Sequence, residues 1–219
     1  MSFFQSLGDS KLSYDDYVAS VVSGNDSAKY VGISALRNSD VLTATSIIAG
    51  DIARFPLIKK NVHGDIIQDE DINYLLNVKS TGNASARTWK FAMAVNTILT
   101  GNAYSRILRD PRTGKALQFQ FYKPSETRVE ESDSHELIYT FIDSLTGKEI
   151  TCGAEDVIHW TFFSHDTILG RSPLLSLGDE ISLQNSGTST LLKFFKDGFS
   201  SGILKMEGAM LSGEARKKA

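Results

Sequence analysis

The sequence predicts an α+β fold in which helices flank an antiparallel β meander. Residues 39–56 and 85–101 repeat apolar side chains at helical spacing, between capping and helix-breaking residues. Residues 102–163 instead alternate apolar and polar side chains between turn signals, as strands do. The 219 residues, 41% hydrophobic and 22% charged, suffice for one large domain or two small ones with a packed core.

The first helix is expected after a loosely ordered arm. Residues 1–33 are rich in Ser, Asp, Gly and Asn and predict such an arm, with one short helical turn near residues 14–22. Ser39 is a candidate N-cap, and Pro56 ends the helix. The predicted buried face consists of Val41, Ala44, Ile48 and Ile52.

Two further helices precede the strands. Residues 57–69 predict a short hairpin with its turn at residues 63–65. Three acidic residues favour the start of a short helix at residues 69–78. Ser85 caps the next helix, which buries Trp89 and Val95. Gly101 and Asn102 are both suited to the left-handed residue that ends a helix.

The strands are predicted at residues 103–110, 116–122, 128–132, 136–143 and 155–163. Ser105 lies in the first of them. It has no histidine near it in the sequence, so we interpret it as a strand residue rather than a nucleophile.

One long helix is predicted from Pro173 to Gly198, with Ser172 as its N-cap. Its ends are apolar, but its centre, residues 184–190, is polar and poor in helix propensity. This pattern suggests a helix that leaves the core and faces a partner or a solvated channel. The alternative is two shorter helices with a loop between them.

The composition excludes several classes of protein. The formal net charge of −3 argues against a strongly basic nucleic-acid surface, although loose contact with DNA stays possible. One cysteine permits no internal disulfide and weakly favours a reducing compartment. Neither a secretory signal nor a membrane-spanning apolar run is present, so no membrane partner is expected.

No motif of a common enzyme class is present: the sequence lacks a phosphate-binding loop, GxGxxG, GxSxG and CxxC. His159, His165 and Asp166 do not match a zinc spacing, and structural or solvent-facing histidines explain them better. We therefore expect no enzymatic activity, no cofactor and no functional metal.

Six segments, in this order, resemble the portal proteins of tailed bacteriophages, in particular the large portal family of long-tailed phages. They are RNSDVLTATSIIAGDIARFPL, INYLLN, WKFAMAVNTILTGNAYSRILRD, FYKPSETRV, EDVIHWTFFSHDTILGRSPLL and FFKDGFSSGILKMEGAML. No single segment is decisive, but the collinear order of all six makes chance similarity improbable. The arm at residues 1–33 does not contribute.

The resemblance implies a homo-oligomeric ring, usually of twelve subunits, at one capsid vertex of the virion. Double-stranded DNA would pass loosely through its channel. The terminase large subunit, the capsid protein and head–tail adaptor proteins would be its partners. Assembly is expected in the cytoplasm of the bacterial host. The alternatives are a non-portal α+β interaction module and a small-molecule-binding enzyme domain.

The resemblance also divides the chain: residues 34–170 would form the wing, 171–199 the stem helix and 200–219 the start of the clip. Family members continue with more clip, a second stem helix and a crown, so we expect this chain to be truncated. Gly170, Ser172 and Pro173 would start the stem helix. The candidates for facing the channel or a neighbouring subunit are Gln184, Asn185, Thr188, Lys193 and Lys196.

Overall fold

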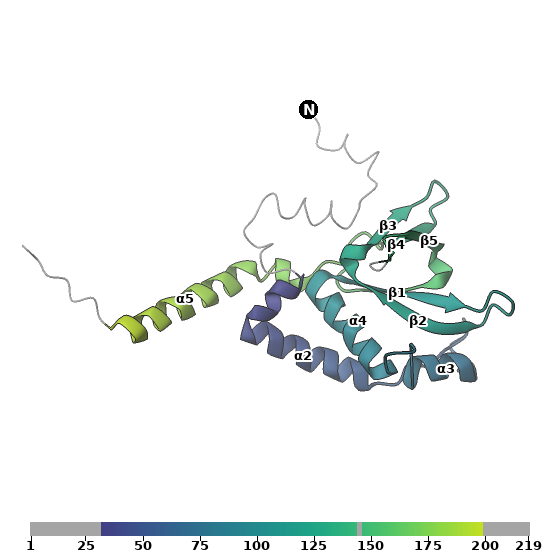
Figure 1. The fold of residues 1–219 in the computed structure, drawn as a ribbon, viewed down its shortest axis with the longest axis horizontal. Coiled ribbons are helices and arrows are strands. Elements are labelled where there is room, and N and C mark those ends of the chain that lie inside the picture. Colours follow the sequence, from purple (N-terminus) through teal and green to yellow (C-terminus); the bar gives the residue numbers. More distant parts are fainter. Residues whose placement is uncertain (1–31, 144–145, 199–219) are drawn as a thin grey trace, which may run out of the picture. The chain divides into compact units, whose positions relative to one another are not determined.

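The computed structural model describes residues 32–143 and 146–198 (Figure 1). The chain forms two compact units, which divide between Ser182 and Leu183. The expected arm lies outside the described residues except for its last two, and so does the expected clip at 200–219. Residues 32 and 33 belong to a 3-10 helix, η3 (Gly32–Arg37).

The first unit begins with helices. They are α2 (Ser39–Arg54), α3 (Glu70–Asn77) and α4 (Ala86–Thr100). Helices α2 and α4 pack side by side (Figure 1). A cluster of buried apolar side chains lies between them. It contains one residue each from η3, α2 and α4 and two from the segment that follows the sheets: Ala35, Val41, Leu99, Leu174 and Ile181.

Helix α2 differs from its prediction in two ways. Its N-cap is Asn38, whose Oδ1 accepts hydrogen bonds from the backbone N–H groups of Asp40 and Val41, so Ser39 is not the cap. The predicted stripe is also wrong: its Ile48 and Ile52 are exposed, as is Ala44. The buried side chains are Val41, Thr45, Ala49 and Ala53. Three of these are small, which lets α2 approach α4 closely.

The other helix boundaries follow the predicted signals. Asp69 caps α3, and Ser85 caps α4 by accepting a hydrogen bond from the N–H of Thr88. Gly101 ends α4 in the left-handed conformation, with φ of 90°. The predicted hairpin at 57–69 is reduced to a single bridge between Lys60 and Ile66, closed by a turn at Gly64.

The strands form two antiparallel sheets of three strands each. The first has the order β2 (Ala116–Tyr122), β1 (Asn102–Arg109), β6 (Val157–Thr161). The second has the order β3 (Thr127–Glu131), β4 (Leu137–Ile142), β5 (Glu149–Gly153). The α+β class is therefore confirmed, but the predicted meander divides in two because β6 returns to pair with β1. Strand β5 was not predicted.

Strand β1 is buried on both faces because it lies between the helices and the second sheet. Ala103 packs in a cluster with Trp89, Met93 and Phe119, between α4 and the first sheet. Tyr104, the next residue, packs in a cluster with residues of the second sheet that includes Phe141. The predicted burial of Trp89 is confirmed, since it is 2% exposed, whereas Val95 is only partly buried.

The segment after the sheets forms two helices. Ser172 accepts a hydrogen bond from the N–H of Leu174 and caps a 3-10 helix, η6 (Pro173–Leu175). Helix α5 (Gly178–Asp197) begins only after it, so the prediction of one helix starting at Pro173 is wrong. The alternative break in the polar centre does not occur either, because α5 is continuous through residues 184–190. Gly198, with φ of 70°, follows the last helical residue.

Candidate functional site: a buried junction and an exposed helix

The segment that leads to α5 is attached to the end of α4 at a close approach of two glycines. There is no space for a side chain at Gly101, because a Cβ there would collide with the backbone of Gly170 and Arg171. A Cβ on Gly170 would collide with the carbonyl of Gly101. The N–H of Phe162 also donates to the Gly101 carbonyl, at 2.8 Å. Glycine at both positions therefore allows the two backbones to meet.

Asn102 joins these two backbones through its side chain and is fully buried. Its Nδ2 donates to the carbonyl of Gly170 at 2.9 Å, and its Oδ1 accepts from the N–H of Gly170 at 2.7 Å. The peptide groups of Gly170 thus fix the orientation of the amide. We call Asn102, His159, Gly170 and Ser172 the Asn102 junction.

His159 completes the hydrogen bonding of this amide. Its Nε2 lies 3.0 Å from Asn102 Oδ1 and its Nδ1 lies 3.2 Å from the hydroxyl of Tyr139. Since Asn102 Oδ1 can only accept, Nε2 carries the proton and Nδ1 accepts from Tyr139. Burial lowers the pKa of His159 from 6.5 to about 4, so the ring is neutral at pH 7.

Ser172 extends the junction to the start of η6. It is 1% exposed and donates its hydroxyl to the carbonyl of Ile98, near the end of α4, at 2.9 Å. The same oxygen accepts the N–H of Leu174, whose side chain is buried in the cluster between α2 and α4. In the same cluster, Ile181 holds the first turn of α5. The junction therefore fixes where α5 begins on the first unit.

The second unit contains the remainder of α5, where the predicted site residues lie. Leu183 and every described residue after it are exposed. No charged residue occurs from Ile181 to Leu192, a run of uncharged side chains that is unusual for an exposed helix. At 100° per residue, Gln184 and Thr188 share one side of the helix with Leu191, and Asn185 lies beside them. After the uncharged run, Lys193 lies on the opposite side of the helix from Gln184, and Lys196 lies in line with Asn185.

Thus the structure places Gly170, Ser172 and Pro173 together at the junction, and it places the five α5 candidates on a separate unit. Asn102 was predicted only as a helix stop, and His159 only as a structural or solvent-facing histidine. The junction pairs residues that lie 57 and 68 positions apart in the chain. No local signal in the sequence identifies such pairs.

Ser105 and His159, which were considered for catalysis and metal binding, have structural roles. Ser105 is fully buried and its hydroxyl accepts the indole N–H of Trp89 at 3.0 Å. Within residues 32–143 and 146–198, no group of three His, Cys, Asp or Glu side chains could hold a metal ion. None of the helices described there is long and apolar enough to cross a membrane.

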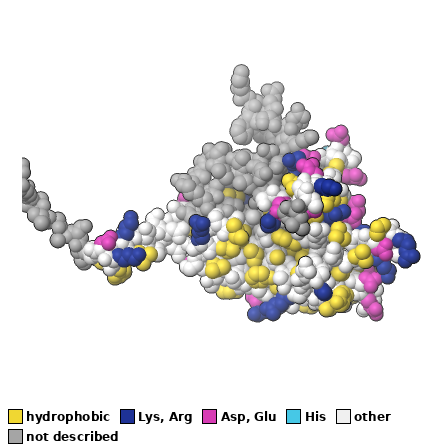
Figure 2. Space-filling model, in the orientation of Figure 1, with side chains coloured by type: hydrophobic (Ala, Val, Ile, Leu, Met, Phe, Trp, Pro, Cys, Tyr) yellow, Lys and Arg dark blue, Asp and Glu magenta, His cyan; other side chains and the backbone are white. Residues whose placement is uncertain are grey.

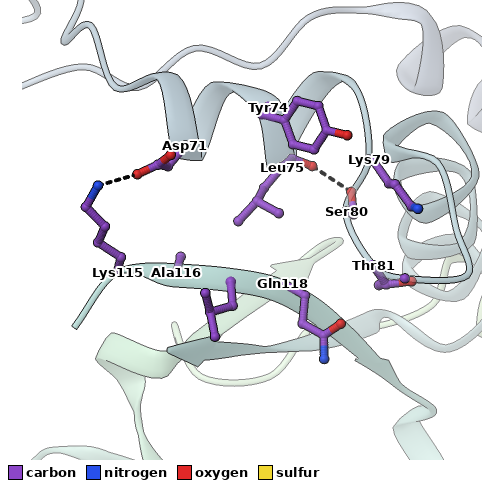
Figure 3. A pocket seen from close by; sticks show the side chains of 11 residues that line it. Asp71, Tyr74, Leu75, Lys79, Ser80, Thr81, Lys115, Ala116 and Gln118 are labelled. Carbon is purple, nitrogen blue, oxygen red and sulfur yellow. Dashed lines mark hydrogen bonds and ion pairs between the residues drawn. The ribbon is translucent and has the colours of Figure 1, made fainter. Parts of the chain in front are cut away.

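A hollow with a volume of about 580 Å³ lies in the first unit between α3, the loop after it and β2 (Figure 3). At one end, Lys115 pairs with Asp71 at 2.8 Å. Deeper in, the hydroxyl of Ser80 donates to the Leu75 carbonyl at 2.7 Å. Both polar pairs are satisfied within the wall, and no nucleophile with a base lines the hollow. It offers no catalytic arrangement.

The family model of the phage portal protein matches residues 39–219. No curated protein matches the chain.

Solved structures share the fold at low sequence identity. A chain from the neck of an empty gene transfer agent particle, determined with C6 symmetry, has a TM-score of 0.58 at 15% identity, over 92% of this chain and 53% of that one. A neck chain from the native particle, determined with C12 symmetry, has a TM-score of 0.57 at 13% identity, over 94% and 52%. An HK97 family phage portal protein from Corynebacterium diphtheriae has a TM-score of 0.56 at 13% identity, over 84% and 57%. The chain thus spans about half the length of these structures.

Proposed function

The chain belongs to the phage portal protein family, and on this premise we propose that it is part of a portal subunit at one capsid vertex of a virion. The observation that carries the proposal is the family match, which extends over residues 39–219 in one continuous run. Portal proteins are structural proteins, so this function requires no catalytic residue in the chain. We expect no ATP hydrolysis by it.

The proposed assembly is a closed homo-oligomeric ring of twelve subunits. Neck structures with the same fold were determined with C6 and C12 symmetry, which supports a ring of this order. In a ring of identical subunits, each copy uses two different surfaces to contact its two neighbours. Double-stranded DNA would pass through the channel of the ring. The terminase large subunit, the capsid protein and head–tail adaptors would dock on its outside.

Within this proposal, residues 34–170 form the wing, 171–199 the stem and 200–219 the start of the clip. The uncharged run of α5 supports the assignment of the stem. An exposed helical segment without charges is suited to contact with neighbouring subunits or with a passing polymer. Each cation that contacts a phosphate releases counterions and adds affinity for DNA, so an uncharged surface lets DNA slide.

Within the same proposal, the Asn102 junction has a mechanical role: it holds the base of the stem helix in position. A helix that borders a channel must keep its position while DNA moves past it. The junction joins the start of this segment to α4 and β1 through Asn102, His159 and Ser172, all of which are hydrogen-bonded within the wing. We propose that the junction fixes the base of the stem, and that Gln184, Asn185, Thr188, Lys193 and Lys196 face the channel or the adjacent subunit.

The test is electron microscopy of the purified full-length protein, together with an assay of DNA packaging into capsids. Closed rings with a central channel, and packaging that depends on the protein, would support the proposal. A protein that stays monomeric at high concentration and is dispensable for packaging would contradict it.

A further inference from the structure

Helix α2 carries an apolar stripe that the described residues do not cover. The stripe, which we call the α2 stripe, consists of Ala44, Ile48 and Ile52, spaced four residues apart on one side of the helix, and of Phe55, the extended residue that follows its last turn. Ile48 is 48% exposed, Ile52 38% and Phe55 66%. None of them belongs to the hydrophobic clusters of residues 32–143 and 146–198. Figure 2 shows hydrophobic side chains gathered on the face of the molecule over α2 and α4.

The side of α2 that is buried is the less apolar one. It presents Val41, Thr45, Ala49 and Ala53 to α4. The larger isoleucine side chains, whose burial stabilises a fold most, thus face outward. A helix with such a surface outward is typical of an element that has a second partner.

The sequence of the arm contains a matching stripe. Between residues 13 and 24, apolar residues fall at positions i, i+3, i+4, i+7 and i+8, and they are Tyr14, Tyr17, Val18, Val21 and Val22. Ser13, followed three residues later by Asp16, is an N-terminal helix signal, and Gly24 is a stop signal. If the helical turn expected near residues 14–22 extends over this stretch, these residues present an apolar side of their own to bury.

The connection between the two stripes is short enough to favour their contact. The chain enters η3 at Gly32, and η3 packs directly on α2. Residues 23–31 can extend over about 30 Å, whereas the 16 residues of α2 span about 24 Å. The arm can therefore reach any part of the α2 stripe. A tether of this length gives an effective concentration of about millimolar.

We propose that residues 14–22 bind the α2 stripe of their own chain as an amphipathic helix. A passing nucleic acid is a poor occupant, because the stripe offers no cation to a phosphate. A second copy could cover the stripe, but the arm of each chain would then have no partner for its own apolar side. The inference does not depend on the proposed portal function.

Amide hydrogen exchange of the full chain tests this contact. The backbone of residues 14–22 should exchange at least about tenfold more slowly than an unstructured peptide of the same sequence. Ile48→Asp/Ile52→Asp on α2, and separately Val18→Asp/Val21→Asp on the arm, should each abolish the protection. The arm variant changes no residue of the described fold, so it stays informative if the α2 variant is unstable. Leu42→Asp/Ile47→Asp, which changes exposed residues of α2 outside the stripe, should leave the protection unchanged. Exchange at the rate of the free peptide in the wild type, or protection that survives both stripe variants, would overturn the inference.

Cross-linking identifies which copy supplies the arm. The chain has one cysteine, Cys152, so Cys152→Ser provides a background without thiols. In that background, Val18→Cys with Ile48→Cys should form a disulfide within one chain, which denaturing mass analysis detects as an oxidised monomer. The pair Val18→Cys with Ile47→Cys is the matched control. It should form a disulfide within one chain less efficiently. A ladder of disulfide-linked oligomers would show that the stripe receives the arm of another copy and would overturn the assignment to the same chain.

Discussion

The side-chain amide of Asn102 forms two hydrogen bonds with the peptide groups of Gly170, a residue 68 positions further along the chain. One side chain therefore pairs both the N–H and the carbonyl of Gly170. This contact lies where α4 ends, where β1 begins and where the segment leading to α5 passes. It joins the proposed wing to the base of the proposed stem.

Asn102→Ala should destabilise the fold by about 2–4 kcal/mol, because it leaves two buried backbone groups of Gly170 and the ring N–H of His159 without their partner. Urea unfolding of the wild type and the variant measures the change. Asn83→Ala, at an exposed asparagine in the loop before α4, should change the stability by less than about 0.5 kcal/mol. Equal effects of both substitutions would show that the junction contributes little.

Stability should fall as the pH drops below 6.5. The folded state keeps His159 neutral because burial lowers its pKa to about 4, while the unfolded state has a pKa near 6.5. The unfolded chain therefore binds a proton first, and the stabilisation present above pH 6.5 is lost progressively down to pH 4. The total loss from this group is about 3 kcal/mol. His159→Gln should remove this part of the pH dependence, and His63→Gln, at an exposed histidine, should not. Identical pH profiles for wild type and His159→Gln would contradict the assignment.

Trp89→Ala should cost about 3–5 kcal/mol, since the indole is buried among the residues between α4 and the first sheet. Ser105→Ala should cost about 1–3 kcal/mol because the buried indole N–H then has no acceptor. Thermal or urea denaturation measures both. A loss below about 1 kcal/mol for Trp89→Ala would mean that the helix packs less tightly than the structure indicates.

The order of elements could be predicted from local signals, but the pairing of distant segments could not. The caps at Asp69 and Ser85 and the stop at Gly101 depend on neighbours within four residues, and sequence shows these directly. The return of β6 to β1 and the contact of Asn102 with Gly170 depend on residues about 60 positions apart. The periodicity of apolar residues within a segment does not indicate which distant segment it will contact.

The error on α2 has a different cause. Periodicity identified the more apolar stripe, which includes Ile48 and Ile52, and we therefore expected that stripe to be the buried face. The α4 interface instead uses Ala49 and Ala53, because small residues permit close packing of two helices. For the five α5 candidates, the structure provides exposure and position along the helix, and their role in a channel stays a prediction.

Thr188→Lys should increase the affinity of assembled full-length rings for DNA if this side of α5 faces the channel. A twelvefold ring would gain about twelve cations, and each phosphate contact adds to the salt dependence of DNA retention. Packaging should slow, while stability should change by less than about 0.5 kcal/mol because Thr188 is exposed. Thr190→Lys places the same charge on the opposite side of the helix and is the matched control. Steeper salt dependence for Thr190→Lys alone would assign the other side to the channel.

The central claim, that this chain is the wing and stem of a ring-forming portal subunit, is tested most directly by electron cryomicroscopy of the purified full-length protein. The account predicts closed rings of about twelve subunits in which residues 178–197 form a helix bordering the central channel. Particles without rotational symmetry, or rings in which this helix lies on the outer surface, would contradict it.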